Sequence, residues 1–193
     1  MKVAILLDGD FTRRLVERKL GRSPSIGEIE AFCRSILIPQ ETLLKIYYYD
    51  CPPFSEQRIQ PVSRSIKDFS ISHVHQQATV FQNDLKQNPS FLYRRGHLSF
   101  DGWTLQQPSI QGLIKAPRPL TDADFEPVLR QKQVDMKIGF DVAKLSIKQS
   151  VGRILLATSD SDFIPAIDFA KTYRIEVVLL SDVFSVRKKR EGY

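Results

Sequence analysis

The chain has 193 residues, of which 42% are hydrophobic and 26% charged, a balance typical of a folded globular domain. Its formal net charge of +6 at pH 7 favours a polyanionic partner without requiring one. No apolar stretch approaches the ~20 residues of a membrane span, and Asp8 and Asp10 come too early for a signal peptide. The two cysteines lack metal-ligand spacing, so we expect reduced thiols in a cytoplasmic protein with no membrane partner.

The order of apolar runs and amphipathic stretches predicts an α/β fold. Runs rich in Val, Ile, Leu and Tyr predict strands at 2–8, 42–50, 153–159 and 176–181. Helical spacing of apolar residues predicts helices at 11–20, in "SPSIGEIEAFCRSIL", and at 70–88, 134–150 and 162–174. Strands that alternate with helices favour a doubly wound, mostly parallel sheet.

The region from about 86 to 120 interrupts this alternation. The stretch "FLYRRGHLSFDGWTL" (91–105) alternates and contains Asp101-Gly102, which predicts a β-hairpin. Prolines and a glycine predict a loop at 106–120. We therefore expect a single domain over residues 1–185 with a hairpin and loop insertion, followed by a basic tail at 186–193.

Aspartates stand where the predicted strands end and helices begin. Asp8 ends the first strand, Asp160 and Asp162 follow the strand at 153–159, and Asp135 starts the helix before it. In an open parallel sheet, ligands bind beyond the carboxyl ends of the strands. Several carboxylates at one place repel each other unless a divalent cation lies between them, and Mg²⁺ and Mn²⁺ prefer oxygen ligands. The pattern predicts a metal site at this edge.

A structural explanation competes with the metal site at each position. Aspartates before a helix are often only N-caps, which applies to Asp160 and Asp162, and more strongly to Asp10. Asp8 is harder to explain in this way, because it ends a fully apolar strand and precedes a glycine. Asp141 lies within an amphipathic helix, where a solvated face is as good an explanation as an indirect role at a metal site.

The segments "LLDGDF", "VDMKIGFDVAKL" and "ILLATSDSDFIPAIDFAKTYRIEVVLLS" together resemble the NYN domain, of the LabA-like branch of the PIN-like nuclease superfamily. The resemblance implies a PIN-like three-layer α/β/α sandwich and a metal-dependent ribonuclease. It implies metal ligation by Asp8, Asp135 and Asp160. The further polar positions that it matches are Asp162, Asp141, Asp10 and Ser159. Ser159 stands where many members have glycine, which changes backbone freedom but removes no ligand.

Basic and aromatic residues interleave in and near the predicted insertion, a pattern that suits single-stranded nucleic acid. The candidate RNA-binding residues are Arg94, Arg95, Trp103, Lys115, Arg118 and Lys137. In the alternative interpretation the aromatic rings pack on a core and the cationic side chains are simply solvated.

We therefore expect an endoribonuclease that uses Mg²⁺ or Mn²⁺, with Asp8, Asp135, Asp160 and Asp162 as its catalytic acids. Direct attack by water would leave a 3′-hydroxyl and a 5′-phosphate. The alternatives are a non-catalytic RNA-binding or regulatory NYN module and a metal-dependent DNA nuclease or phosphatase. The sequence leaves the oligomeric state open, a homodimer included.

Overall fold

The computed structural model describes residues 1–180, and its contacts divide the chain into two compact units. Unit 1 comprises Met1–Asp50, Phe81–Gly96 and the chain from Gln133 onward, and unit 2 comprises Cys51–Val80 and His97–Lys132. The basic tail expected at 186–193 lies outside the described residues. No helix within the described part has the length and apolar character that a membrane crossing requires.

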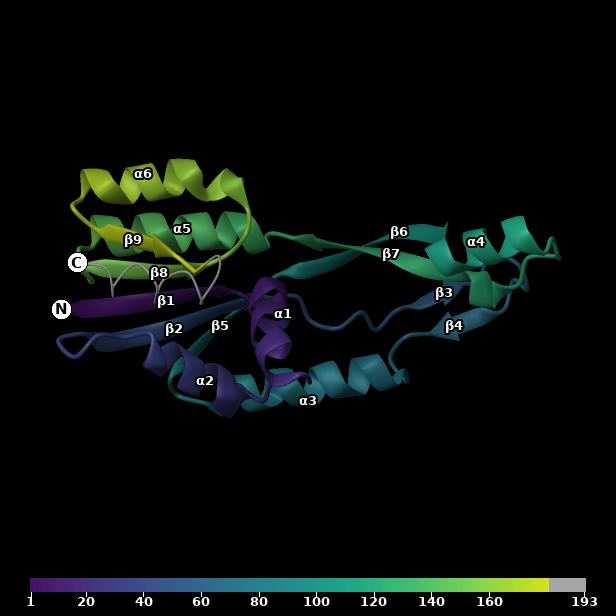
Figure 1. Cartoon of the computed structure of the whole chain (residues 1–193), viewed down its shortest axis with the longest axis horizontal. Helices are drawn as coiled ribbons and strands as arrows, with labels where there is room; N and C mark the ends of the chain where they lie inside the picture. Colours follow the sequence, from purple (N-terminus) through teal and green to yellow (C-terminus); the bar gives the residue numbers. More distant parts are fainter. Residues whose placement is uncertain (181–193) are drawn as a thin grey trace. The chain divides into compact units, whose positions relative to one another are not determined.

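A five-stranded parallel sheet in the order β5-β2-β1-β8-β9 forms the centre of unit 1 (Figure 1). Its strands are β1 (Lys2–Asp8), β2 (Thr42–Asp50), β5 (Phe91–Arg95), β8 (Arg153–Ala157) and β9 (Glu176–Leu179). Residues 3–7 of β1 are fully buried, because the central strand is covered on both faces. Leu7 pairs with Tyr48 on one side and with Ala157 on the other.

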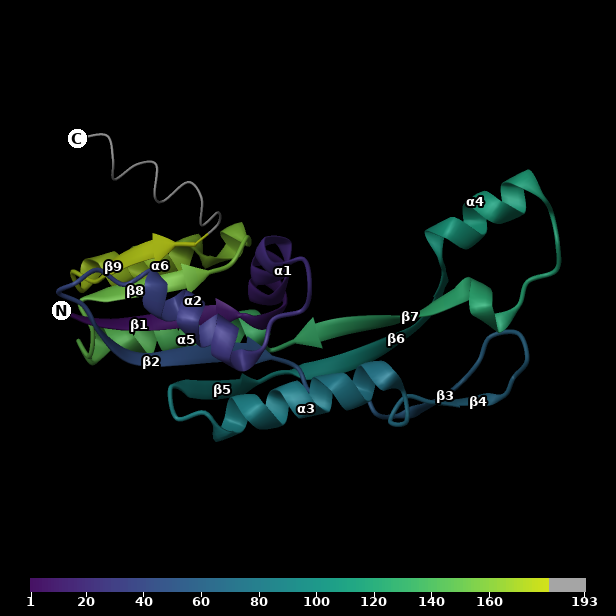
Figure 2. The same cartoon turned by 60° about the horizontal axis from the view of Figure 1, so that its bottom comes forward.

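Helices cover both faces of this sheet (Figures 1 and 2). They are α1 (Gly9–Leu20), α2 (Ile26–Ser35), the second half of α3 (His73–Gln87), α5 (Val134–Ile147) and α6 (Ile164–Thr172), the last preceded by the short helix η2 (Ser161–Phe163). Residues of α2 and α3 pack with Val3, Ile5 and Leu7 on one face, and α5 and α6 lie on the other. Unit 1 thus has the α/β architecture with a parallel sheet that the sequence predicts, in the layers of a three-layer sandwich.

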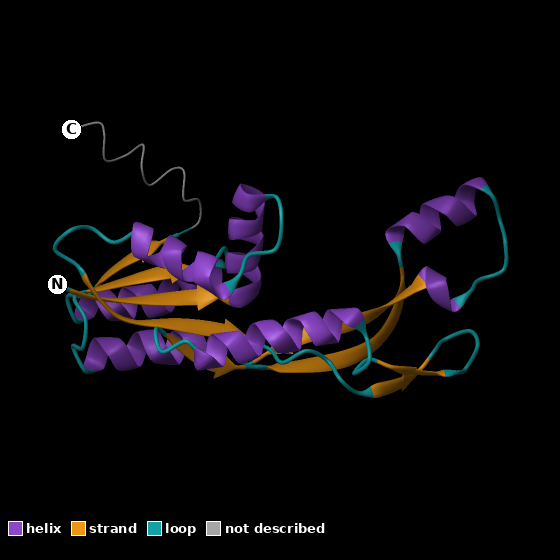
Figure 3. Cartoon of the chain, turned by 90° about the horizontal axis from the view of Figure 1, so that it is seen from below, coloured by secondary structure: helices purple, strands orange, loops and turns teal. Residues whose placement is uncertain are grey.

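Helix α1 packs tightly against β2 at the point where the chain leaves β1. A Cβ atom added at Gly9 would lie 2.8 Å from Tyr48 Cε1 and 2.8 Å from the Tyr49 carbonyl oxygen. Glycine is therefore required here by space and not by backbone conformation. In all three views α1 lies crosswise to the strands, at the end of the sheet where β1 stops (Figures 1, 2 and 3).

Unit 2 is built from two antiparallel strand pairs, β3 (Gln57–Ile59) with β4 (Ile66–Asp68) and β6 (His97–Leu105) with β7 (Phe125–Lys132). Helix α4 (Gln107–Lys115) and the short helix η1 (Asp122–Asp124) lie between β6 and β7 in the chain. Its aromatic cluster consists of Phe54, Phe69, Phe100 and Trp103.

The prediction of a β-hairpin at 91–105 is wrong. Phe91–Arg95 pairs in parallel with β2 as an edge strand of the central sheet, and His97–Leu105 pairs with Phe125–Lys132. Gly96 separates the two strands, and its N–H donates to the Asp50 carbonyl oxygen at 2.8 Å. The inserted region is accordingly drawn from Cys51–Val80 and His97–Lys132, and not from 86–120.

The loop predicted at 106–120 contains helix α4. Its proline, Pro108, lies in the first turn, where no intrahelical N–H bond is lost, so proline does not exclude a helix there. Strands β3, β4 and β7 were not expected from the sequence. The first two have only three residues each, and β7 contains Pro127.

Candidate functional site

The carboxyl edge of the unit 1 sheet collects the predicted acidic residues. Asp8 is the last residue of β1, and Asp160 follows the neighbouring strand β8 after two residues. The side chain of Lys137, in the first turn of α5, donates to the carbonyl oxygen of Arg95 at the end of β5. Because α5 begins at this same edge, Asp135 joins Asp8 and Asp160 there.

Asp8 is the N-cap of α1. Its Oδ1 accepts hydrogen bonds from the N–H groups of Asp10 at 3.0 Å and Phe11 at 3.2 Å. No other described residue bonds to this carboxylate, so its second oxygen is available to a ligand. Capping and ligand binding are therefore compatible here, since each can use a different oxygen.

Asp160 repeats this arrangement beyond β8. Its Oδ1 accepts from the Asp162 N–H at 2.8 Å, while the Asp160 N–H donates to Thr158 Oγ1 at 3.1 Å. Thr158 is buried, whereas Ser159, Asp160 and Asp162 are exposed. The turn after β8 is thus held by its own hydrogen bonds and presents two carboxylates to solvent.

Charge repulsion links the acids of this edge. Partial burial raises the pKa of Asp8, and the charges of Asp10 and Asp135 raise it further, against the opposing effect of the two N–H donors. Partial burial also raises the pKa of Asp135, together with the charges of Asp160 and Asp162. We name Asp8, Asp135, Asp160 and Asp162 the acidic edge.

The acidic edge is not a closed ligand cage. Within residues 1–180, no three His, Cys, Asp or Glu side chains are grouped closely enough to hold a metal ion. Its donors are nonetheless carboxylate oxygens, the type that Mg²⁺ and Mn²⁺ prefer, and Mg²⁺ usually retains several waters and binds through one or two carboxylates. Asp8, Asp135 and Asp160 fit a water-rich site of this kind and do not fit an all-protein cage.

Asp10 and Asp141 are placed very differently. Asp10 is half-buried in the first turn of α1 and forms an ion pair with Arg14 at 2.9 Å. Asp141 is buried, and Arg94 grips both its oxygens, with Nε at 2.7 Å from Oδ2 and Nη2 at 2.9 Å from Oδ1. The Tyr49 hydroxyl donates to the same Oδ2 at 2.8 Å. Asp141 is therefore neither solvated nor turned to the acidic edge, but is a buried partner of Arg94.

A second ion pair stabilises the other face of β2. Arg13 Nη1 donates to Asp50 Oδ2 at 2.6 Å, and Asp50 is buried at the end of the strand. The same guanidinium donates to the Tyr48 hydroxyl at 3.3 Å. These functions of Arg13, Asp50 and Tyr49 were not predicted from the sequence, since their partners are distant in the chain and no short motif contains them.

Most of the residues predicted to bind RNA have partners within the protein. Arg94 is paired with Asp141, and Arg118 donates to Asp124 Oδ2 at 2.8 Å. Lys137 bonds to the carbonyl oxygen of Arg95. The side chains of Lys115 and Arg95 are exposed, and no ion pair is found for either within residues 1–180.

Trp103 belongs to the aromatic cluster of unit 2. Its ring stacks on Phe69 with centroids 6.0 Å apart, and Lys67 Nζ lies 5.6 Å from its centroid. Its Nε1 donates to the Ile59 carbonyl oxygen at 2.9 Å. These contacts support the alternative interpretation, in which the aromatic residues of this region form a core.

Comparison with known proteins gives no functional assignment. No family model matches the sequence, and no curated protein matches it. A crystal structure of a protein of unknown function from Vibrio parahaemolyticus is similar, with 12% sequence identity and a TM-score of 0.48. The match covers 92% of this chain and 79% of that one.

Proposed function

We propose that the protein is a metal-dependent endoribonuclease that hydrolyses RNA at the acidic edge with Mg²⁺ or Mn²⁺. The observation that carries this proposal is the gathering of Asp8, Asp135, Asp160 and Asp162 at one edge of the sheet. There, partial burial and, to a smaller extent, the charges of neighbouring aspartates raise the pKa of Asp8 and Asp135. Groups that repel at one edge are relieved by a divalent cation, and perturbed carboxylates gather at functional sites more often than elsewhere.

The resemblance to the NYN domain adds to this proposal. The three segments that carry it contain Asp8 at the end of β1, Asp135 at the start of α5 and Asp160 after β8. These are the positions that the sheet order brings to one edge, with β1 and β8 as neighbours. On this proposal the protein is a PIN-like nuclease and works on RNA in the cytoplasm.

The chain's own residues would hold and orient the reacting groups. Asp8 and Asp160 are fixed by the backbone N–H groups that they cap, so their remaining oxygens have a defined direction. A divalent ion bound there would supply activation of water and neutralisation of the scissile phosphate. Asp135 is exposed and has no hydrogen bond within residues 1–180, so it can rotate toward an ion as the site fills.

A non-catalytic RNA-binding module is the second candidate. The observation that favours it is the lack of three potential ligands in one group among the described side chains. On this proposal the fold is retained for binding, and the acidic edge has no role in bond breaking.

A cleavage assay separates the two candidates. Purified protein is incubated with RNA and with single-stranded DNA in Mg²⁺, Mn²⁺ or EDTA. We expect RNA to be cut only with a divalent ion, to give 3′-hydroxyl and 5′-phosphate ends, and to survive with Asp8→Asn or Asp160→Asn. Asp168→Asn is the matched control, because Asp168 is an exposed aspartate paired with Lys171 on α6. Cutting that persists in EDTA, or that Asp8→Asn leaves at full rate, contradicts the nuclease proposal.

A further inference from the structure

We propose that helix α1 carries the binding track for a single-stranded phosphodiester, through the exposed side chains of Arg14 and Arg18. This proposal rests on the proposed function, because it names the surface that delivers a strand to the acidic edge. It concerns unit 1 alone and assigns no role to unit 2.

The location of α1 suits a strand that enters the acidic edge. The helix starts at Asp8, its N-cap, and lies crosswise at the end of the sheet (Figure 1). Arg14 forms an ion pair with Asp10, which lies in the first turn of α1. Arg18 lies one turn after Arg14. A strand bound to these two arginines would therefore reach Asp8 without leaving the helix.

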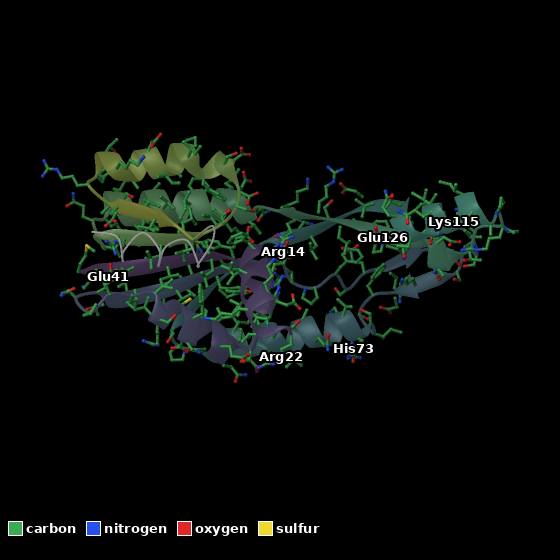
Figure 4. All side chains as sticks on the ribbon, viewed as in Figure 1. Arg14, Arg22, Glu41, His73, Lys115 and Glu126 are labelled. Carbon is green, nitrogen blue, oxygen red and sulfur yellow. The ribbon has the colours of Figure 1, made fainter. Side chains whose placement is uncertain are left out.

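Arg14 and Arg18 are more accessible to a phosphate than the nearby Arg13 and Arg22. Arg13 is turned inward to Asp50 and Tyr48, and Arg22 forms a two-point ion pair with Glu28. Arg18 is exposed and has no ion pair or hydrogen bond among the described residues. Figure 4 labels Arg14, on α1, and Arg22, which follows the C-cap of that helix.

The Arg14–Asp10 pair does not remove Arg14 from this track. The Arg14 side chain is 60% exposed and that of Asp10 is 45% exposed, so water reaches the pair. An exposed ion pair of this kind contributes about 0–1 kcal/mol, so a phosphate can replace the carboxylate at little cost.

Helical geometry sets the two cations in line. Residues four apart lie on the same face, separated by about 6 Å along the axis. Two guanidinium groups in such a row can each bind a phosphate of one flexible strand, and the planar guanidinium suits phosphate oxygens. A small phosphate ester, which is too short to reach both guanidinium groups, would bind only one of them.

The charge distribution favours unit 1 as the binding surface. Unit 2 has seven Lys and Arg residues and six Asp and Glu residues, a net charge of +1, whereas the part of unit 1 within residues 1–180 has 17 Lys and Arg and 14 Asp and Glu, a net charge of +3. In unit 2, Arg58, Arg118 and Arg130 are paired with Glu56, Asp124 and Asp101. Within residues 1–180, unit 1 is thus more complementary in charge to a polyanion than unit 2.

Equilibrium binding in EDTA tests this inference separately from cleavage. Fluorescence anisotropy of labelled oligo(U) and oligo(dT) is measured over a salt series for the wild type and for Arg14→Gln with Arg18→Gln. Two lost contacts on a single strand reduce the slope of log K against log salt by about 1.4, which corresponds to a loss of about 25-fold at 0.1 M salt. Equal losses for both oligonucleotides show phosphate recognition, and a loss confined to oligo(U) shows that the track is specific for RNA.

Lys2→Gln with Lys148→Gln is the matched control. It removes the same charge from exposed positions at the start of β1 and the end of α5, at the opposite edge of the sheet. We expect little change with this control. A third variant, Asp10→Asn, frees Arg14 and removes a negative charge, so we expect tighter binding.

Each result tests the inference about α1 independently of whether the protein cleaves RNA. Binding by the wild type that the arginine variant loses supports the track, even if no variant cuts RNA with a divalent ion. The inference is overturned if the arginine variant binds as tightly as the wild type, or if it loses no more affinity than the lysine control. It is also overturned if the wild type binds neither oligonucleotide. That result would leave the proposal of Asp8-dependent RNA cleavage unaffected.

Discussion

At the scale of single residues, Asp8 has two roles with opposite effects on stability. Its carboxylate caps α1, which stabilises the fold, while burial and the charges of Asp10 and Asp135 raise its pKa. A native pKa above the unfolded value of 3.8 means that the folded protein binds the proton more readily. The contribution of Asp8 to stability is therefore greatest below pH 3.8 and falls as the pH rises through the native pKa.

We predict that Asp8→Asn raises the melting temperature at pH 7 in EDTA, because asparagine caps a helix as well as aspartate does and carries no charge. Asp8→Ala removes the cap as well as the charge, and the lost cap costs about 0.5–2 kcal/mol. Thermal melts from pH 3 to 8 check this. The advantage of Asp8→Asn has to shrink toward acid, where wild-type Asp8 is also neutral. An Asp8→Asn protein that melts below the wild type at pH 7 contradicts the repulsion.

Arg94 and Asp141 form a buried pair in which each partner depends on the other. Breaking such a pair costs about 3–5 kcal/mol, and we expect the lower end because the guanidinium is 34% exposed. We predict that Arg94→Ala lowers the free energy of unfolding by this amount, while Arg95→Ala, its exposed neighbour, changes it little. Urea denaturation of the two variants is the measurement. Equal stability of both would show that the pair does not form in solution.

The candidate site could be predicted from the sequence only in part. Asp8 and Asp160 end apolar runs, so chain order alone places them at strand ends, and a parallel sheet brings such ends together. The pairing of Arg94 with Asp141 joins residues 47 positions apart. No local pattern encodes that pairing, and it removes from the RNA-binding set an arginine that looked exposed.

At the scale of elements, a strand can be read from local alternation, but its partner cannot. Phe91–Arg95 and His97–Leu105 are both strands, as the alternation predicts, yet they belong to different sheets. Their apparent hairpin fails because Phe91 is buried against the core of unit 1, where the edge of β2 is available for a parallel partner. The helices of unit 1 and the strands β1, β2, β8 and β9 were predicted well. In β1 and β8, burial on both faces leaves continuous apolar runs, whereas the edge strand β9 is only partly buried.

The contact between α1 and β2 gives an element-scale prediction. We predict that Gly9→Ala destabilises the protein, because the new methyl group would overlap both the Tyr48 ring and the Tyr49 carbonyl oxygen. Gly139→Ala is the control, since a Cβ there meets nothing within 4 Å and lies in the interior of α5. It should stabilise the protein by about 0.5–1 kcal/mol. Chemical denaturation of both variants compares them, and a Gly9→Ala protein as stable as the wild type would show that α1 does not pack as described.

At the scale of the whole molecule, the two units differ in how their cores are built. Unit 1 has a central strand covered on both faces, whereas unit 2 has two separate two-stranded ladders around four aromatic rings, two of them half-buried. Two-stranded ladders are marginal without further packing. Arg58 and Lys67 lie over these rings and add cation–π stabilisation to the small core of unit 2.

The stability of the whole chain reports metal binding without any assay of activity. A ligand that binds the folded protein and not the unfolded chain raises the free energy of unfolding by about 2.7 kcal/mol at a hundred times its Kd. We predict that Mg²⁺ or Mn²⁺ raises the wild-type melting temperature at pH 7. The increase should disappear as the pH falls toward 3.8, because protons then compete for Asp8 and Asp135, whose pKa values are raised.

NaCl at the same ionic strength is the control for general screening of the acidic edge, and it should give a smaller shift. Asp8→Asn and Asp160→Asn should lose the part of the shift that is specific for divalent ions, while Asp168→Asn keeps it. The metal-free melting temperature of Asp8→Asn should exceed that of the wild type, so the variant gains stability without an ion and loses the response to it. The gain of metal-free stability and the loss of the response to the ion have one cause, the repulsion between Asp8 and its neighbouring carboxylates, which a divalent ion would relieve. If Mg²⁺ and Mn²⁺ shift the wild type no more than NaCl does, the acidic edge binds no divalent ion, and the non-catalytic proposal replaces the nuclease.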